Sequence, residues 1–171
     1  MEDELMEAAL AGDAVAMLRV ALRYEQQEDE AQAQEWYARA ARAGHAEAMV
    51  IYGALLHEQG QGDQARSWYE RAAALGDPDA WAVLGALAVE NDELAAAEEH
   101  YRRAIAAGNQ DALVYLAGVC ELTGRVPQAV ELLAQAVAAD VAEARELLAE
   151  LAAEGHAAAQ AQLARLAADA D

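Results

Sequence analysis

Apolar side chains recur along this chain at the three- and four-residue spacing of one helical face, in short segments separated by polar turns. In residues 79–90 the apolar stripe contains Ala80, Leu84 and Ala88, and a second stripe follows in residues 94–107. Strand-like alternation rich in Val, Ile and Thr is not sustained anywhere. The pattern therefore predicts an all-α protein built from short amphipathic helices.

The same pattern returns every 32 residues. The stretch WYARAARAGH at 36–45 reappears as WYERAAALGD at 68–77. Three series of positions keep this interval: Gly12, Gly44, Gly76, Gly108 and then Asp140; Ala16, Ala48, Ala80, Ala112 and Ala144; and Leu5, Tyr37, Tyr69, Tyr101 and Leu133. Self-similarity at a fixed period of this size is typical of repeat proteins. Each unit divides into two helical segments.

Short polar turns connect these segments. Gly76 can adopt the left-handed conformation that ends a helix, and Asp77 or Asp79 can accept hydrogen bonds from the first amides of the next helix. Pro78 suits the first turn of that helix. Because short turns make consecutive helices antiparallel neighbours, each unit is expected to be a helical hairpin.

The landmarks of one unit resemble the tetratricopeptide repeat. They fall at Trp81, Leu84, Gly85, Ala97, Tyr101 and Ala104. The longer stretch WYERAAALGDPDAWAVLGAL is similar to the Sel1-like repeat (SLR) branch of that superfamily, and the match recurs four times over about residues 4–139. The resemblance implies a right-handed α-solenoid of antiparallel hairpins with about ten helices. The period of 32 is shorter than the roughly 34 residues of the tetratricopeptide repeat.

We therefore predict one solenoid domain over residues 1–171. Its parts are an N-terminal half-repeat cap at 2–11, repeats at 12–43, 44–75, 76–107 and 108–139, and a degenerate repeat with a C-terminal capping helix at 140–171. Terminal repeats of solenoids are expected to depart from the consensus because they cap the stack.

The Trp-Tyr pairs at 36–37 and 68–69 are interpreted as packing. Tyr69 shares its stripe with Ala65 and Ala72, whose small side chains let two helices approach closely, so Tyr69 is predicted to fill the space between the helices of one hairpin. Trp68 lies one residue further round and is predicted to cover the joint to the adjacent unit. His100 occupies this place in the next repeat, which indicates that the Trp position is less demanding.

The charge is strongly negative. All 11 basic residues are Arg, against 31 Asp and Glu, which gives a formal net charge of -20 and a pI of about 4.3. This balance disfavours nucleic acid and anionic membranes as partners, since both attract clustered Lys and Arg. The acidity either maintains solubility or expresses a preference for basic partners. The Ala-rich, lysine-free composition hints at a bacterial genome rich in GC.

Cys120 is the only cysteine, which excludes an intrachain disulfide and a cysteine-based metal cluster, and its position predicts a core residue. The N-terminus, MEDELMEAALAGD, lacks the basic start and apolar run of a secretory signal. No window approaches roughly 18 uninterrupted apolar residues. A soluble, cytoplasmic protein is the expectation.

An enzyme was weighed as the rival class. The four histidines lie in separate units, and no His-Glu-x-x-His pattern, glycine-rich phosphate loop or glycine-flanked nucleophilic serine occurs. His57 could ligate a metal or move a proton with Glu58 and Glu90, or it could be an ordinary surface histidine. We predict no catalytic residue, no metal ligand and no cofactor.

The resemblance implies that the first helix of each hairpin lines a concave face. Candidate partner-binding residues are the positions of these helices not used for packing: Leu18, Arg19, Leu22, Val50, Ile51, Ala54, His57, Ala82, Val83, Ala86, Val89, Val114, Tyr115, Gly118 and Leu122. Either neighbouring repeats cover this apolar surface, or it is a groove for a partner segment. In tetratricopeptide domains that bind chaperones, basic residues on this face hold the carboxylates of the acidic chaperone tail. The corresponding positions here are Leu18, Val50 and Asp79, so a carboxylate clamp of this kind is not expected.

Acidic residues border the same face, at Glu25, Glu47, Asp79, Glu90, Asp111 and Glu121. We therefore predict a non-catalytic protein–protein interaction scaffold or adaptor, whose partner is a protein or peptide segment with apolar and basic residues. The alternative is a self-associating structural or regulatory repeat protein, either a monomer or a weak homodimer.

Overall fold

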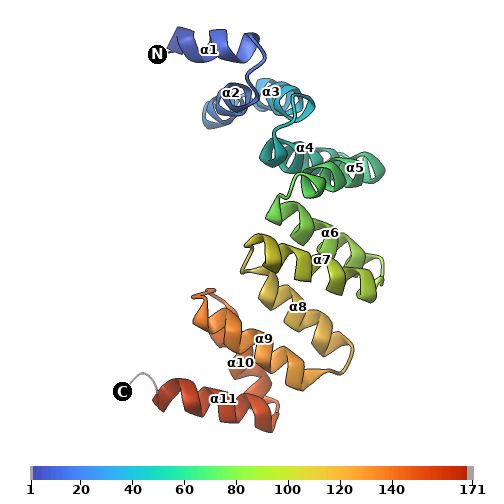
Figure 1. Cartoon of the computed structure of the whole chain (residues 1–171), viewed down its shortest axis with the longest axis vertical. Coiled ribbons are helices and arrows are strands. Elements are labelled where there is room, and N and C mark those ends of the chain that lie inside the picture. The colour runs from blue at the N-terminus through green and yellow to red at the C-terminus, as the bar shows by residue number, and fades with distance from the viewer. Residues whose placement is uncertain (1, 169–171) are drawn as a thin grey trace. The chain divides into compact units, whose positions relative to one another are not determined.

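A computed structural model of the chain describes residues 2–168, and these residues form eleven α-helices and no strand. The helices are α1 (Glu2–Leu10), α2 (Ala14–Gln26), α3 (Glu30–Arg42), α4 (Ala46–Glu58), α5 (Gly62–Ala74), α6 (Pro78–Glu90), α7 (Leu94–Ala107), α8 (Ala112–Leu122), α9 (Val126–Ala138), α10 (Ala144–Ala153) and α11 (Ala157–Ala168) (Figure 1). The prediction of an all-α stack of hairpins is confirmed, with one helix more than the ten expected.

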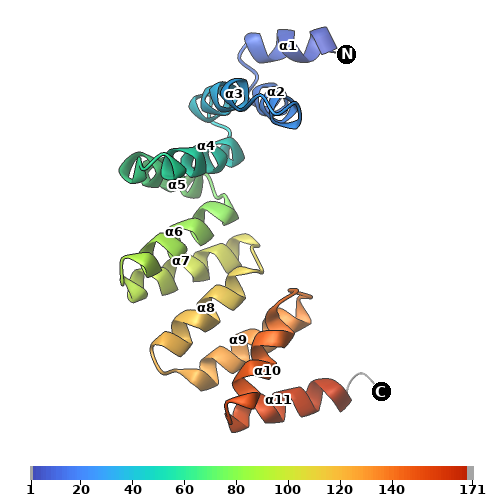
Figure 2. The ribbon, with the colours of Figure 1, turned by 180° about the vertical axis from the view of Figure 1, so that it is seen from behind.

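The chain divides into two compact units, Met1–Trp81 and Ala82–Asp171, with the boundary inside α6. In the first unit α2 packs on α3 and α4 packs on α5, while α1 packs on α2. In the second unit α8 packs on α9 and α10 packs on α11. The two opposite views in Figures 1 and 2 show these pairs side by side, each pair forming one hairpin.

Left-handed backbone marks the end of almost every helix. One series of positive φ angles falls at Gly12, Gly44, Gly76, Gly108 and Asp140, as the sequence period predicts. A second series with the same period falls at Glu28, Gly60, Asp92 and Gly124, between the two helices of each hairpin. This second series is hard to predict from the sequence, because Glu28 and Asp92 are not glycines.

Each of these turns closes its helix with the same pair of hydrogen bonds. After α6, the Asp92 amide donates to the Val89 carbonyl at 2.9 Å and the Glu93 amide donates to the Ala88 carbonyl at 2.8 Å. This is the Schellman arrangement, which requires a left-handed residue at the first position after the helix.

Side-chain caps begin α2, α4, α6 and α8, the first helices of four hairpins, whereas α10 has none. The Asp77 carboxylate accepts the amides of Asp79 and Ala80 at 3.1 and 2.9 Å, so Asp77 rather than Asp79 is the capping residue. Asn109 accepts the amide of Ala112 at 2.9 Å in the equivalent place. Two features therefore mark these repeat boundaries: a left-handed residue ends one helix, and a capping residue begins the next.

The buried tyrosines fill the space between the helices of a hairpin, as predicted. A Cβ atom added at Gly53 of α4 would lie 2.6 Å from Cε1 of Tyr69 on α5, and one added at Gly85 of α6 would lie 2.5 Å from Cε1 of Tyr101 on α7. Both rings are buried. The absence of a side chain at the two glycines is what admits the aromatic ring.

Trp68 differs from its prediction. Its ring makes an edge-to-face contact with Tyr52 of α4, with centroids 5.5 Å apart and planes at 72°. Because Tyr52 belongs to the same hairpin, this ring contact lies within the repeat and not at the joint to the next one. Trp68 is only half-buried, consistent with the lesser role expected for it.

The C-terminal part of the chain forms one more hairpin. Gly155 adopts a φ of 96° between α10 and α11, one residue before the place that the 32-residue period would give. Ala159 is fully buried, and Leu163 and Leu166 pack against the same core as Leu148. The predicted capping helix is thus the second helix of a shortened hairpin. Residues 169–171 of the predicted cap lie outside the described residues.

Candidate functional site

An apolar groove in the second unit is the most developed concave surface among the predicted contact residues. Its volume is about 440 Å³, within the size range of ligand pockets. Four helices contribute: α6, α7, α8 and α10. The lining residues are Val89, Tyr101, Val114, Tyr115, Gly118, Val119, Glu121, Leu122 and Leu147. We refer to this surface as the α8 groove.

Two buried side chains form the base of the α8 groove. Val119 and Tyr101 are both almost fully enclosed by protein. The Tyr101 ring lies 5.6 Å from the ring of Tyr115, with a tilt of 35°. Burial, with smaller contributions from Tyr115 and Glu90, raises the pKa of Tyr101 to about 12, so this phenol stays neutral at physiological pH.

Two large apolar side chains stand open beside this base. Tyr115 is 51% exposed and Leu122 is 67% exposed. Single exposed hydrophobic residues are ordinary, but two that adjoin the same concave surface mark a site where a partner can bury them.

Gly118 leaves room between these two side chains. No heavy atom lies within 4 Å of the position that a Cβ atom would take there. Gly118 therefore differs from Gly53 and Gly85, which are filled by tyrosine rings. The absence of a side chain at Gly118 therefore deepens the α8 groove, and no other side chain of residues 2–168 fills the space.

Glu121 is the one acidic side chain that lines the α8 groove. Burial raises the pKa of this carboxyl, and the negative charges of Glu154 and Glu150 raise it further, while His156 lowers it. Although Glu121 is exposed at the surface, its carboxylate is partly desolvated on one side and repelled by its acidic neighbours. A cation brought to it would relieve both effects.

The structure places five of the fifteen predicted contact residues along the α8 groove: Val89, Val114, Tyr115, Gly118 and Leu122. Two others, Leu18 and Ala82, are buried, with exposed fractions of 6% and 9%, and leave little surface for a partner. Arg19, Ala54, His57 and Ala86 are exposed, and Leu22, Val50, Ile51 and Val83 are half-buried, but none of these eight lines the α8 groove.

Four lining residues were not predicted. Tyr101 was identified only as a landmark of the repeat, Val119 was not singled out, and Glu121 was placed only on the border. Leu147 belongs to the degenerate fifth repeat, where the alignment with the other repeats is weakest. The periodic position of Tyr101 was the one signal that could have indicated its place beneath α8.

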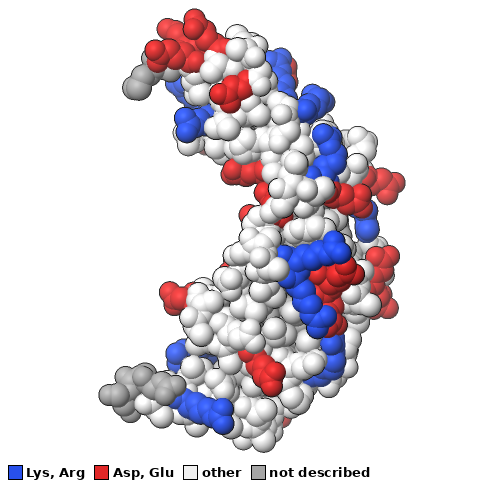
Figure 3. All heavy atoms as spheres, viewed as in Figure 1, with Lys and Arg blue, Asp and Glu red and all other residues white. Residues whose placement is uncertain are grey.

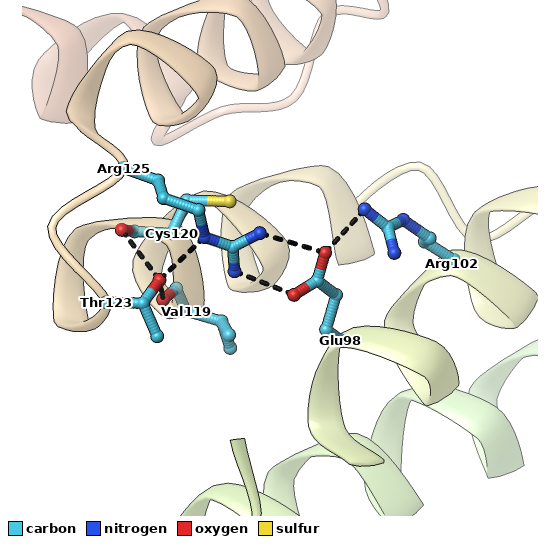
Figure 4. Close-up of polar contacts among 6 residues, drawn as sticks. All are labelled: Glu98, Arg102, Val119, Cys120, Thr123 and Arg125. Carbon is cyan, nitrogen blue, oxygen red and sulfur yellow. Dashed lines mark hydrogen bonds and ion pairs between the residues drawn. The ribbon is translucent and has the colours of Figure 1, made fainter. Parts of the chain in front are cut away.

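A polar contact that the sequence did not predict fixes the helices behind the α8 groove. Arg125, in the turn between α8 and α9, donates to both carboxylate oxygens of Glu98 on α7, at 3.1 and 2.7 Å (Figure 4). Its Nε also donates to the Thr123 hydroxyl at 2.9 Å, and that hydroxyl donates to the Val119 carbonyl at 2.8 Å. Arg102 pairs with Glu98 from the other side at 2.5 Å.

The two guanidinium groups set the charge state of Glu98. Hydrogen bonding to Arg125 is the main cause that holds the pKa of this carboxyl below its ordinary value, and the charge of Arg102 adds to it, although burial opposes both. Figure 3 shows acidic and basic side chains interleaved over α7, in contrast to the acidic surface of α1. The contact ties α7 to the end of α8, the two helices whose tyrosines meet in the α8 groove.

Residues 2–168 give little support for a metal site, a reactive cysteine or a membrane-spanning helix. Within that range no cluster of three or more His, Cys, Asp and Glu side chains has the geometry to hold a metal ion. Cys120 is buried in the core of the second unit, and burial raises the pKa of its thiol. No described helix combines the length and apolarity needed to cross a lipid bilayer.

Comparison with known proteins supports the architecture. No family model and no curated protein matches the chain. A solved protective antigen of uropathogenic Escherichia coli, which displays an SLR fold, is 27% identical over 86% of this chain with a TM-score of 0.73. A Sel1 repeat protein from Oxalobacter formigenes is 24% identical over 88% with a TM-score of 0.73. PilW, a type IV pilus biogenesis factor, is 23% identical over 98% with a TM-score of 0.65.

The lengths of these proteins differ. This chain spans 35% of the antigen, 68% of the Oxalobacter protein and 83% of PilW. The common element is therefore the stack of helical hairpins.

Proposed function

Because this chain has the fold of the tetratricopeptide and Sel1-like repeat superfamily, we propose that it is a non-catalytic protein-interaction scaffold whose α8 groove binds a segment of a partner protein. The observation that carries the proposal is the pair Tyr115 and Leu122, both exposed beside a concave apolar surface. A fold alone does not specify a function, so the argument rests on this surface.

The α8 groove suits an apolar side chain better than a polar one. Apart from Glu121 and the hydroxyls of two tyrosines, its lining side chains are apolar. A polar ligand group entering this space would lose water without gaining enough hydrogen bonds, at a cost of about 1–3 kcal/mol for each group left unpaired. A Leu, Ile or Met side chain of a partner would fill the room beside Gly118.

The partner should also carry a basic residue. The Glu121 carboxylate sits at the α8 groove with its pKa raised by burial and by neighbouring acidic groups. An Arg or Lys of the partner would pair with it and bring its pKa back down. The net charge of -20 would also favour encounter with a basic segment.

The expected affinity is modest. Burying an exposed large apolar side chain contributes about 1.5–3 kcal/mol, so Tyr115, Leu122 and the partner side chains that cover them contribute several such increments. Association costs about 4–15 kcal/mol before any net affinity remains. A transient, micromolar complex is the outcome of this balance.

The test is affinity capture from the native lysate with a matched pair of variants. Tyr115→Glu combined with Leu122→Glu places two charges in the α8 groove, and because Tyr115 also contacts the buried Tyr101 ring, circular dichroism must show that the variant keeps its helicity. The control is Leu10→Glu combined with Leu75→Glu, because these leucines are 67% and 60% exposed and lie in the first unit. The proposal predicts that the wild type and the control variant capture the same partner protein and that the groove variant does not.

Two other results would count against it. A partner captured equally by all three proteins would show that the α8 groove is not the contact surface. Capture of further copies of the chain itself, with a molecular mass above the monomer in light scattering, would instead support the self-associating alternative.

A further inference from the structure

The first unit contains a stack of cations and aromatic rings that the α8 groove does not involve. Arg71 of α5 lies over the Trp68 ring at 4.0 Å, Trp68 meets the Tyr52 ring of α4 edge to face at 5.5 Å, and Arg42 of α3 lies 6.0 Å from the Tyr52 centroid. We call these four residues the arginine–aromatic cluster. Both arginines are exposed and both rings are half-buried.

Comparison of the repeats shows why Arg71 is unusual. Arg39, Arg71 and Arg103 occupy the same place in three successive repeats. Arg39 pairs with Glu35 four residues before it at 2.5 Å, and Arg103 pairs with Glu99 in the same way. The residue four before Arg71 is Ser67, which carries no charge. Arg39 also lies over a Trp ring, that of Trp36, at 4.4 Å. Arg71 therefore keeps the stacking on Trp but has no carboxylate four residues before it.

Arg42 is a second departure from the repeat. Ala74 and Ala106 stand in the equivalent places of the next two repeats. Within residues 2–168, neither Arg42 nor Arg71 is joined to a carboxylate by an ion pair. Other arginines of the described residues also lack an ion pair, but Arg42 and Arg71 are distinguished because both adjoin one pair of aromatic rings.

We propose that the arginine–aromatic cluster binds carboxylate side chains of an acidic segment of a partner protein. A guanidinium stacked on an aromatic face keeps its N–H groups in the plane of the fork, free to donate to a carboxylate in a bidentate geometry. Stacking also restrains the long side chain, so less conformational entropy is lost when the ligand binds. Ser67 is exposed beside the cluster and leaves open the space that Glu35 and Glu99 fill in the other repeats.

An acidic peptide fits better than a nucleic acid. Only two unpaired cations are involved, and the rest of the chain is strongly acidic, so an extended polyanion would be repelled over most of its length. A short acidic segment, of the length of six glutamates, places one or two carboxylates on the cluster and extends over far less of the acidic surface than a nucleic acid would. All four residues lie in Met1–Trp81, so the proposal stands or falls separately from the one on the α8 groove.

The test is an NMR titration of the whole chain with a hexaglutamate peptide at low salt. The indole Nε1–H resonance of Trp68, assigned from a Trp68→Phe variant, should move progressively as the peptide is added. The shift should shrink when salt is raised from about 50 to about 500 mM, because exposed ion pairs are screened. A hexaglutamine peptide should leave the resonance in place.

Ser67→Glu is the decisive variant. It recreates the pairing found at Glu35–Arg39, so Arg71 becomes occupied from within, and binding should weaken at least about twofold while helicity by circular dichroism is kept. Arg71→Gln should weaken binding similarly. The matched control is Arg39→Gln, which removes an arginine that is already paired and should leave binding unchanged. The proposal is overturned if Trp68 does not respond to hexaglutamate, if hexaglutamine binds equally, or if Ser67→Glu binds as tightly as the wild type.

Discussion

At the scale of single residues, glycine has opposite roles in two repeats. Gly85 is required because the Tyr101 ring occupies the place of its side chain, whereas Gly118 faces empty space beside α8. Both glycines lie in the middle of a helix, where glycine costs about 1 kcal/mol relative to alanine. The first glycine is retained for packing, and the second widens the α8 groove.

Alanine substitutions should separate these two roles. Gly85→Ala should destabilise the protein by about 1–3 kcal/mol, since the Tyr101 ring must shift to avoid the new methyl group. Gly118→Ala should stabilise it by up to about 1 kcal/mol, because the helix propensity improves and no clash arises. Thermal melts of both variants followed by circular dichroism measure the difference, and two changes of the same sign would contradict the packing described here.

The Trp-Tyr pair should divide its contributions unequally. Tyr69 is buried against Gly53, so Tyr69→Ala should lower the free energy of unfolding by roughly 3–5 kcal/mol, as for other buried aromatic residues. Trp68 is half-buried and contacts Tyr52 and Arg71 near the surface, so Trp68→Ala should cost noticeably less. Urea denaturation of the two variants gives the comparison, and a larger loss for Trp68 would reverse this assignment.

At the scale of elements, the helices α1 to α10 each end in a left-handed residue, and the period of 32 is visible in the turns as well as in the core. Glycine holds most of these places, but Glu28, Asp92 and Asp140 adopt a φ of 60° without being glycines. A left-handed conformation costs roughly 1–2 kcal/mol for an ordinary residue, with Asp better tolerated than Glu.

Glu28→Gly should therefore stabilise the first hairpin, by up to about 1 kcal/mol once the greater flexibility of glycine in the unfolded chain is subtracted. The reverse change at the equivalent turn, Gly60→Ala, should destabilise it by a similar amount. Differential scanning calorimetry of the two variants tests both signs, and an unchanged melting temperature for Glu28→Gly would mean that the turn stores no strain.

The contact between α7 and the α8–α9 turn should make stability depend on pH. Arg125 holds the pKa of Glu98 below the ordinary value of 4.5, so the ionised form favours folding. This contribution is fully present above pH 4.5 and is lost as the pH falls through the lowered pKa of the folded state.

Glu98→Gln should lower the melting temperature at pH 7 by roughly 2–4 °C, as expected for about 1 kcal/mol in a chain of this size. The difference from the wild type should shrink below pH 4.5. Glu99→Gln is the matched control, because its pair with Arg103 is exposed and should contribute little. An equal effect of both variants, or one that does not depend on pH, would argue against the role given to Glu98.

The repeat made most of these elements predictable. The spacing of Gly76, Asp77 and Pro78 predicted the start of α6 to within one residue, and the stripe of Tyr69 predicted its packing. What the period could not reveal were the places where one repeat departs from the others. The Glu98 and Arg125 pair joins residues 27 positions apart, so neither periodicity nor helix spacing indicates it.

At the scale of the whole molecule, the regular positions build the stack and the irregular ones supply its candidate surfaces. Gly118, Tyr115 and Leu122 distinguish α8 from the equivalent helices, and Ser67 and Arg42 distinguish the first unit. The burial of Leu18 and Ala82 was not foreseen because the sequence period does not separate the partly open face of a first helix from the face buried by its neighbours. Whether a position on a first helix is exposed depends on its neighbours in space, and some of these are distant in the sequence.

The central claim is that the α8 groove holds a partner segment, and site-specific photo-crosslinking in the native cell tests it most directly. A photoreactive amino acid at position 122 replaces the exposed Leu122, and the same amino acid at position 75 replaces Leu75 as the control. The account predicts a covalent adduct to a second protein at position 122 and none at position 75. An adduct at both positions, or none at position 122, would contradict it.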